Sequence, residues 1–250
     1  MSLLIVERLQ KKFSGLTATD DFSMTVPTGE LHAVIGPNGA GKTTLINQLS
    51  GNLIPDSGRI LFDGADITRE APEARAQAGI GRSYQITSVF PEFSVIENVM
   101  LAAAAIGPKR ISPWRALMSD RAARDLSESQ LQRVGLQDKI NEPVVSLAHG
   151  SRRQLELAMT LAASPRLLLL DEPMAGMSPH ETSAMTKLLA SLKSEYTILL
   201  VEHDMDVVFS LADRITVLVY GRSIACGNVE EIQNSPAVKE AYLGEEEDGL

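Results

Sequence analysis

The stretch Gly36-Pro37-Asn38-Gly39-Ala40-Gly41-Lys42-Thr43 decides the fold that this sequence predicts. Its spacing matches the pattern G-x-x-x-x-G-K-[ST] of a phosphate-binding loop. The apolar segment 31–35 before it is typical of a buried strand, and residues 45–49 are expected to form a helix. Glycines let the backbone N–H groups converge on phosphates, and the following helix adds the positive end of its dipole. The stretch therefore predicts a nucleotide site on a strand–loop–helix unit.

Two side chains of this loop have expected chemical roles. Lys42 is expected to neutralise the β- and γ-phosphates, and the Thr43 hydroxyl to bind Mg²⁺. Further nucleotide contacts are expected from Gly36, Asn38, Gly39, Ala40, Gly41 and Thr44. A glycine turn without a ligand is the alternative, and the strand, the helix and a downstream acid pair all argue against it.

A second apolar run, residues 167–170, ends in the acids Asp171 and Glu172. Charges at the tip of a buried strand are costly unless a cation compensates them, and Mg²⁺·ATP supplies one. We expect Asp171 to bind Mg²⁺, directly or through water, and Glu172 to be the general base that orients the attacking water. Two solvated acids are the alternative, which would be preferred if Lys42 were absent.

Composition limits the class of protein. The 250 residues are expected to form one large domain. The net charge of −9 argues against a nucleic-acid binder, because affinity for phosphate backbones comes from clustered Lys and Arg. The single cysteine, Cys226, cannot form an internal disulfide and favours a reducing compartment. No signal peptide is expected, and the apolar stretch 99–106 is too short to span a bilayer.

Hydrophobic periodicity predicts an α/β fold with a parallel sheet. The runs 198–201 and 215–219 are typical of strands buried on both faces, and residues 179–193 have the stripe of an amphipathic helix capped by Ser178 and Glu181. We expect an N-terminal antiparallel β subdomain (1–35 and 52–66), a catalytic core (36–51, 67–90 and 164–250) and an inserted helical subdomain (91–163). Helices are expected at 95–105, 121–134 and 152–163.

With these motifs in this order, nearly the whole chain resembles the nucleotide-binding subunit of an ABC transporter, a P-loop ATPase. The resemblance implies that Phe13 stacks on adenine, that Gln85 senses Mg²⁺ and the γ-phosphate, and that His203 holds the γ-phosphate. It also implies that Leu147-Ala148-His149-Gly150-Ser151 is the signature, which faces the nucleotide of a second ATPase subunit. Phe13 as a core aromatic and the histidines as local hydrogen-bonding groups are the alternatives.

The signature departs from the usual LSGGQ form of the family. Ala148 has no hydroxyl, so one hydrogen bond to the phosphate is lost, on the order of 1–3 kcal/mol. Ser178 stands where aspartate is usual, although its capping role explains a serine. We therefore expect this signature to contribute at less than full strength.

Four segments, 90–99, 170–177, 201–205 and 241–244, resemble the ATPase subunits of branched-chain amino-acid importers. The resemblance implies two permeases, a second identical or different ATPase, an indirect link to a substrate-binding protein, and a place on the cytoplasmic face of the inner membrane. Systems for urea or amides, lipopolysaccharide export, and a regulatory subunit with weak hydrolysis remain alternatives; an ATPase acting on DNA or translation is disfavoured. The acidic tail 245–248 is expected to be solvated and disordered, with partner docking as the alternative.

Overall fold

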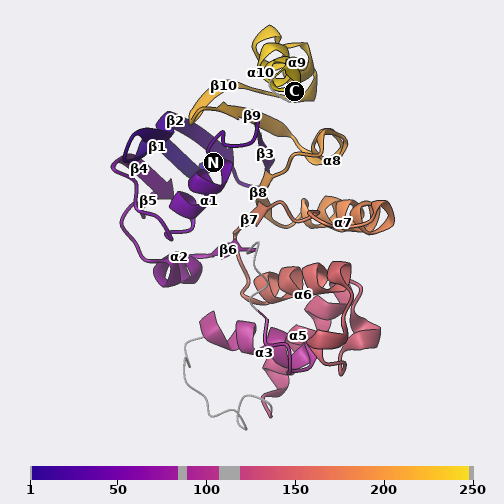
Figure 1. Ribbon diagram of the computed structural model, residues 1–250. Helices are drawn as coiled ribbons and strands as arrows, with labels where there is room; N and C mark the ends of the chain where they lie inside the picture. Colours follow the sequence, from indigo (N-terminus) through magenta and orange to yellow (C-terminus); the bar gives the residue numbers. More distant parts are fainter. Residues whose placement is uncertain (1, 84–88, 107–118, 248–250) are drawn as a thin grey trace.

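The computed structural model describes residues 2–83, 89–106 and 119–247, arranged around two β-sheets (Figure 1). The first sheet is antiparallel, with the order β2-β1-β4-β5. Its strands are β1 (Ser2–Phe13), β2 (Leu16–Pro27), β4 (Ser57–Phe62) and β5 (Ala65–Asp66). Strands β1 and β2 have 12 residues each and carry several register shifts between them.

The second sheet has six strands in the order β10-β9-β3-β8-β7-β6. It is parallel from β9 to β6, with β10 antiparallel at one edge. Its strands are β3 (Leu31–Ile35), β6 (Ile80–Arg82), β7 (Leu167–Asp171), β8 (Thr197–Val201), β9 (Arg214–Val219) and β10 (Arg222–Gly227). The predicted α/β class with a parallel sheet and an N-terminal antiparallel layer is confirmed.

One expected boundary was wrong. The range 1–35 assigned β3 to the antiparallel layer, but β3 pairs with β8 and β9 inside the parallel sheet. All five residues of β3 are buried, which suits a strand covered on both faces. The edge strand β10 was not predicted, because most of its residues are exposed and it lacks an apolar run.

Nine α-helices lie within the described ranges (Figure 1). They are α1 (Lys42–Leu49), α2 (Pro72–Ala78), α3 (Val95–Ile106), α5 (Arg121–Arg133), α6 (His149–Ala162), α7 (Pro179–Leu192), α8 (Met205–Leu211), α9 (Val229–Asn234) and α10 (Pro236–Glu247). Two of them, α3 and α5, pack on α6 away from the sheets. Helix α6 begins three residues before the expected position 152. Residues 245–247, predicted to be disordered, belong to α10, because glutamate is a good helix former. None of the described helices is both long and apolar enough to cross a membrane.

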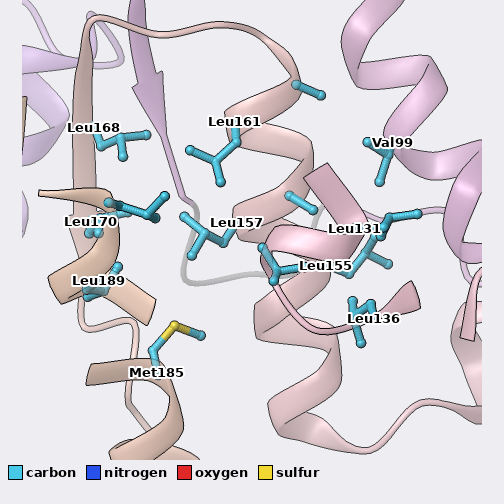
Figure 2. Packing of buried hydrophobic residues seen from close by; sticks show 14 of the residues in the cluster. Val99, Leu131, Leu136, Leu155, Leu157, Leu161, Leu168, Leu170, Met185 and Leu189 are labelled. Atoms are coloured by element: carbon cyan, nitrogen blue, oxygen red, sulfur yellow. The ribbon is translucent and has the colours of Figure 1, made fainter. Parts of the chain in front are cut away.

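Alternate residues of the parallel sheet face two different cores. Leu167 and Leu169 pack with α1 and the antiparallel sheet. Leu168 and Leu170 point the other way, towards Leu157 and Leu161 of α6 and the side chains of α7 (Figure 2). Each fully buried leucine contributes roughly 1.5–3 kcal/mol to folding. The sheet therefore separates the layer of the phosphate loop from the layer of α6 and α7.

The predicted cap of α7 is confirmed. The Glu181 amide donates to the Ser178 hydroxyl over 3.4 Å, and the Ser178 amide donates to the Glu181 carboxylate over 2.9 Å. Because each side chain bonds the other residue's backbone, this capping box fixes where the chain turns into α7.

Candidate active site

The phosphate loop joins the end of β3 to the start of α1, and two of its glycines are required by close backbone contacts. A Cβ at Gly36 would lie 2.0 Å from the Leu218 carbonyl oxygen, and one at Gly41 would lie 2.2 Å from that of Ala18. Gly41 also has φ 105°, a conformation that L side chains rarely adopt. The loop is therefore fixed against both β9 and β2.

Lys42 lies at the centre of this loop. Its ammonium donates to the carbonyl oxygens of Gly36 and Pro37, the latter over 2.9 Å. Ala40 is buried, whereas Asn38, Gly39 and Thr43 are exposed and Thr44 is half-buried. The loop thus holds a cation against its own carbonyls and presents its outer residues to solvent, which suits the binding of an anionic ligand.

Asp171 is the last residue of β7 and is only 1% exposed. Neither of its carboxylate oxygens has a hydrogen-bond partner among the described residues. Burial raises the pKa of Asp171, and the Arg82 guanidinium, 3.7 Å away, opposes this rise, as Lys42 does at longer range. A buried carboxylate with two uncommitted oxygens suits a hard cation such as Mg²⁺, which binds through few carboxylates plus substrate phosphates.

The described part of the chain holds no cluster of three or more His, Cys, Asp or Glu side chains that could bind a metal. The remaining ligands of a cation at Asp171 would therefore come from Thr43 and Gln85, from water and from a bound phosphate group.

Glu172 follows Asp171 with an unusual backbone. Its φ of 49° is uncommon for a residue with a side chain, and such strain occurs most often at functional sites. The Glu172 amide donates to the Val201 carbonyl over 2.9 Å, which fixes the turn to β8. The His203 Nδ1 lies 3.9 Å from the Glu172 carboxylate. Glu172 and His203 are therefore neighbours in the structure.

Glu202 is a residue of the site for which no role was predicted from the sequence. Its carboxylate is buried, which raises its pKa, and it accepts the amides of Met174 over 3.1 Å and His203 over 3.2 Å. Glu202 thus anchors the segment after Glu172 to the residue that follows β8. The signal was present, because an acid directly after a buried apolar strand is the pattern that identified Asp171.

Phe13 and His32 have different environments. Phe13, at the end of β1, is 45% exposed and lies under the Lys11 ammonium at 5.7 Å, so it is not a core aromatic. His32 is buried and bonds Glu30 over 2.8 Å and Thr216 over 2.7 Å, which is the local structural role considered for the histidines. Gln85 lies outside the described residues.

The signature segment forms the start of α6. Ala148 is the N-cap and offers no side-chain hydrogen bond. The His149 ring nitrogen Nε2 lies 3.1 Å from the Ala175 carbonyl oxygen, and Gly150 packs so closely on Glu181 that a Cβ would lie 2.2 Å from its carboxylate. Figure 1 shows α6 and α1 on opposite sides of β6 and β7. The signature and the phosphate loop therefore lie in different layers of this chain.

Comparisons with known proteins agree with this geometry. The family model described as ABC transporter matches residues 19–175, and the model of the branched-chain amino acid ATP-binding cassette transporter matches residues 222–248. The chain is 38% identical to the high-affinity branched-chain amino acid transport ATP-binding protein LivG of Salmonella typhimurium, over 97% of this chain and 98% of that protein.

Two further comparisons extend these matches. The chain is 34% identical to the lipopolysaccharide export system ATP-binding protein LptB of Haemophilus influenzae, over 98% of this chain and 99% of that protein. A crystal structure of the ADP conformation of an ATP-binding cassette of an ABC transporter superposes with a TM-score of 0.85 at 30% identity, covering 98% of this chain and 99% of that one.

Proposed function

Because this chain belongs to the ABC transporter family, we propose that it binds Mg²⁺·ATP and hydrolyses it as the motor subunit of an importer of branched-chain or other amino acids. The observation that carries the proposal is the buried Asp171 carboxylate, whose oxygens accept no hydrogen bond from the described residues. It lies beside the strained Glu172 and close enough to Lys42 to be affected by its charge.

The residues of the site divide the chemistry among them. The loop amides and Lys42 bind the β- and γ-phosphates, and Phe13 stacks on the adenine. Thr43 and Asp171 hold Mg²⁺ with Gln85, and the ion when bound neutralises charge on the phosphates. Glu172 takes a proton from the attacking water, and His203, beside it, holds the γ-phosphate. The buried Glu202 keeps His203 and the segment after Glu172 in position.

The second ATPase subunit completes each site. Because the signature lies in a different layer from the chain's own phosphate loop, it is free to present Gly150 and the N-terminus of α6 to the nucleotide of a partner. Closure follows from γ-phosphate contacts that ADP lacks, and hydrolysis reopens the pair. The partner is either a second copy of this chain or a related ATPase.

A cavity of about 260 Å³ between the two layers suits a permease segment. It is lined from the core by Ala76, Ile80 and Arg82, and from the helical layer by Ala102, Met159 and Ala163. Such a mainly apolar groove suits the apolar face of a cytoplasmic helix. Near this region Phe90 and Phe93 stack on each other with ring centroids 5.3 Å apart, and Phe90 is exposed, so we propose that they contribute to the same docking site. Docking there would hold the chain at the cytoplasmic face of the inner membrane.

Two findings favour amino-acid import over lipopolysaccharide export. The C-terminal match at 222–248 is to the branched-chain amino acid family, and the identity to LivG exceeds that to LptB. A substrate-binding protein would then supply cargo to the permeases without contacting this chain.

The test uses the complex assembled with its permeases and Glu172→Gln. The variant should bind Mg²⁺·ATP, lose at least 100-fold in hydrolysis, and accumulate an ATP-bound dimer, because the water is no longer activated. Glu230→Gln, an exposed change on α9, is the matched control and should hydrolyse normally. If Glu172→Gln leaves turnover and dimer lifetime unchanged, the assigned base is wrong; if the complex transports no amino acid, the assigned cargo is wrong.

A further inference from the structure

Arg82 connects three parts of the molecule that the proposed mechanism treats separately. It is the last residue of β6, which pairs with β7, and its side chain is only 8% exposed. Its Nη1 donates to the side chains of Asn47 and Ser50 of the α1 segment, both over 2.7 Å. Its Nη2 lies 3.7 Å from the Asp171 carboxylate.

The 3.7 Å separation is too long for a hydrogen bond, yet short enough for a strong charge interaction in a buried place. The guanidinium therefore compensates the charge of Asp171 without using either oxygen as an acceptor, and both stay available for a metal ion. Arg82 is held in place by its hydrogen bond to Asn47 of α1. Asn47 lies one helical turn after Thr43, another expected ligand of the metal ion.

Arg82 also lines the 260 Å³ cavity, together with Ser83 and with Glu156 and Thr160 of α6. A single side chain thus meets the wall of the cavity on one side and the metal-binding carboxylate on the other. A movement of the Arg82 side chain at the cavity must change its interaction with Asp171, and the reverse also holds, because both places are in contact with the same rigid, buried guanidinium.

We propose that Arg82 is a positioning residue that acts as a built-in counter-charge for Asp171, competes with Mg²⁺ for that carboxylate, and so links metal occupancy to the cavity. The inference rests on the proposed function. Two cations near one carboxylate repel each other, so binding of Mg²⁺ weakens the ion pair between Asp171 and Arg82 at the end of β6. By linkage, a partner that moves Arg82 from the cavity side changes the affinity for Mg²⁺ by the same factor by which Mg²⁺ changes the affinity for that partner.

The direction in which the Mg²⁺ midpoint shifts distinguishes this counter-charge role of Arg82 from a purely structural role. The full chain is titrated with Mg²⁺ at a fixed concentration of a fluorescent ATP analogue, and the midpoint of the bound signal is read. Arg82→Gln keeps a hydrogen-bonding amide for α1 but removes the competing charge, so the midpoint should fall by about 3- to 10-fold. Arg82→Lys keeps the charge and should stay within twofold of the unsubstituted chain.

Arg75→Lys is the matched control. Arg75 lines the same cavity and donates to the carbonyls of Gln48 and Leu49 at the end of α1, whereas the ion pair of Asp171 among the described residues is with Arg82. The midpoint of the Mg²⁺ titration of Arg75→Lys should not change, even if this variant is less stable than the unsubstituted chain. Arg82→Met, a second neutral variant, is used if Arg82→Gln does not fold.

An unchanged or raised midpoint in both neutral variants overturns the inference alone, because it shows that Arg82 only organises the site. A chain without substitutions that binds the analogue independently of Mg²⁺ overturns the proposed function, and the inference with it. In the complex with permeases, assembly should shift the midpoint of the unsubstituted chain at least fivefold, and Arg82→Gln should reduce that shift to within twofold. A shift that is absent, or that survives in Arg82→Gln, overturns the link to the cavity.

Discussion

Replacing Gly41 by alanine tests whether the phosphate loop needs glycine for its backbone angle or for its close contact with β2. Gly41 has φ 105°, and a Cβ there would lie 2.2 Å from the Ala18 carbonyl oxygen, far inside van der Waals contact. Gly39, two residues earlier, has φ 79° but no atom within 4 Å of a built Cβ. Both positions therefore have a positive φ, but only a Cβ at Gly41 would collide with a neighbouring atom.

The magnitudes follow from this difference. Alanine with positive φ costs roughly 1–2 kcal/mol, so Gly39→Ala should lower the melting temperature by about 2–8 °C at 2–4 °C per kcal/mol. Gly41→Ala adds an overpacking cost of about 1–3 kcal/mol and must displace the loop or β2 by about 1 Å. A displacement of that size at the start of α1 should reduce ATPase activity about 100-fold.

Calorimetry of the isolated chain and ATPase assays of the assembled complex measure both effects. Gly39→Ala should remain active within about tenfold, because its Cβ meets open space and only the backbone angle is strained. Equal losses of stability and activity in the two variants would refute the reasoning, since they would assign the whole requirement to the backbone angle.

Three further predictions concern other parts of the chain. Ser178→Ala removes the cap of α7 and should cost about 0.5–2 kcal/mol by denaturant unfolding, whereas Ser191→Ala, near the other end of α7, should cost less than 0.5 kcal/mol; equal costs would contradict the capping role. As a hypothesis drawn from the missing hydroxyl, Ala148→Ser should raise ATP turnover of the assembled complex on the order of tenfold, about 1.4 kcal/mol, and an unchanged rate would count against it. Hydrogen bonding from His32 lowers the pKa of Cys226 to about 7, so iodoacetamide should alkylate the folded chain with a midpoint near that pH and the urea-unfolded chain near pH 8.5; identical midpoints would exclude the effect.

The sequence predicted most elements of the core because their signals are local. The apolar runs of β3, β7, β8 and β9 have no other stable location than a sheet covered on both faces. The capping box of α7 is equally local, since it depends on two side chains three positions apart. Such features follow from adjacent residues and require no knowledge of the tertiary fold.

The features that were missed depend on residues far apart in the sequence. The exposed β10 is a strand only because β9 lies beside it. The contact of Arg82 with Asp171 joins positions 89 residues apart and exists because β6 and β7 are neighbours in the sheet. No local pattern marks that arginine, so only the register of the strands reveals it.

Asp171 and Glu202 illustrate what a sequence pattern leaves undecided. Each is an acid at the end of a buried parallel strand, and β7 and β8 pair side by side, with Asp171 opposite Val201. Burial raises the pKa of both. Glu202 accepts two backbone amides and is thereby a fixed part of the scaffold, whereas neither oxygen of Asp171 accepts a hydrogen bond from the described residues. Since a buried carboxylate is stable only when something compensates its charge, Asp171 depends on cations, which are Arg82 within the chain and a metal ion from outside it. The supply of backbone N–H donors at each strand end, rather than the acid itself, therefore assigns metal binding to one carboxylate and support to the other.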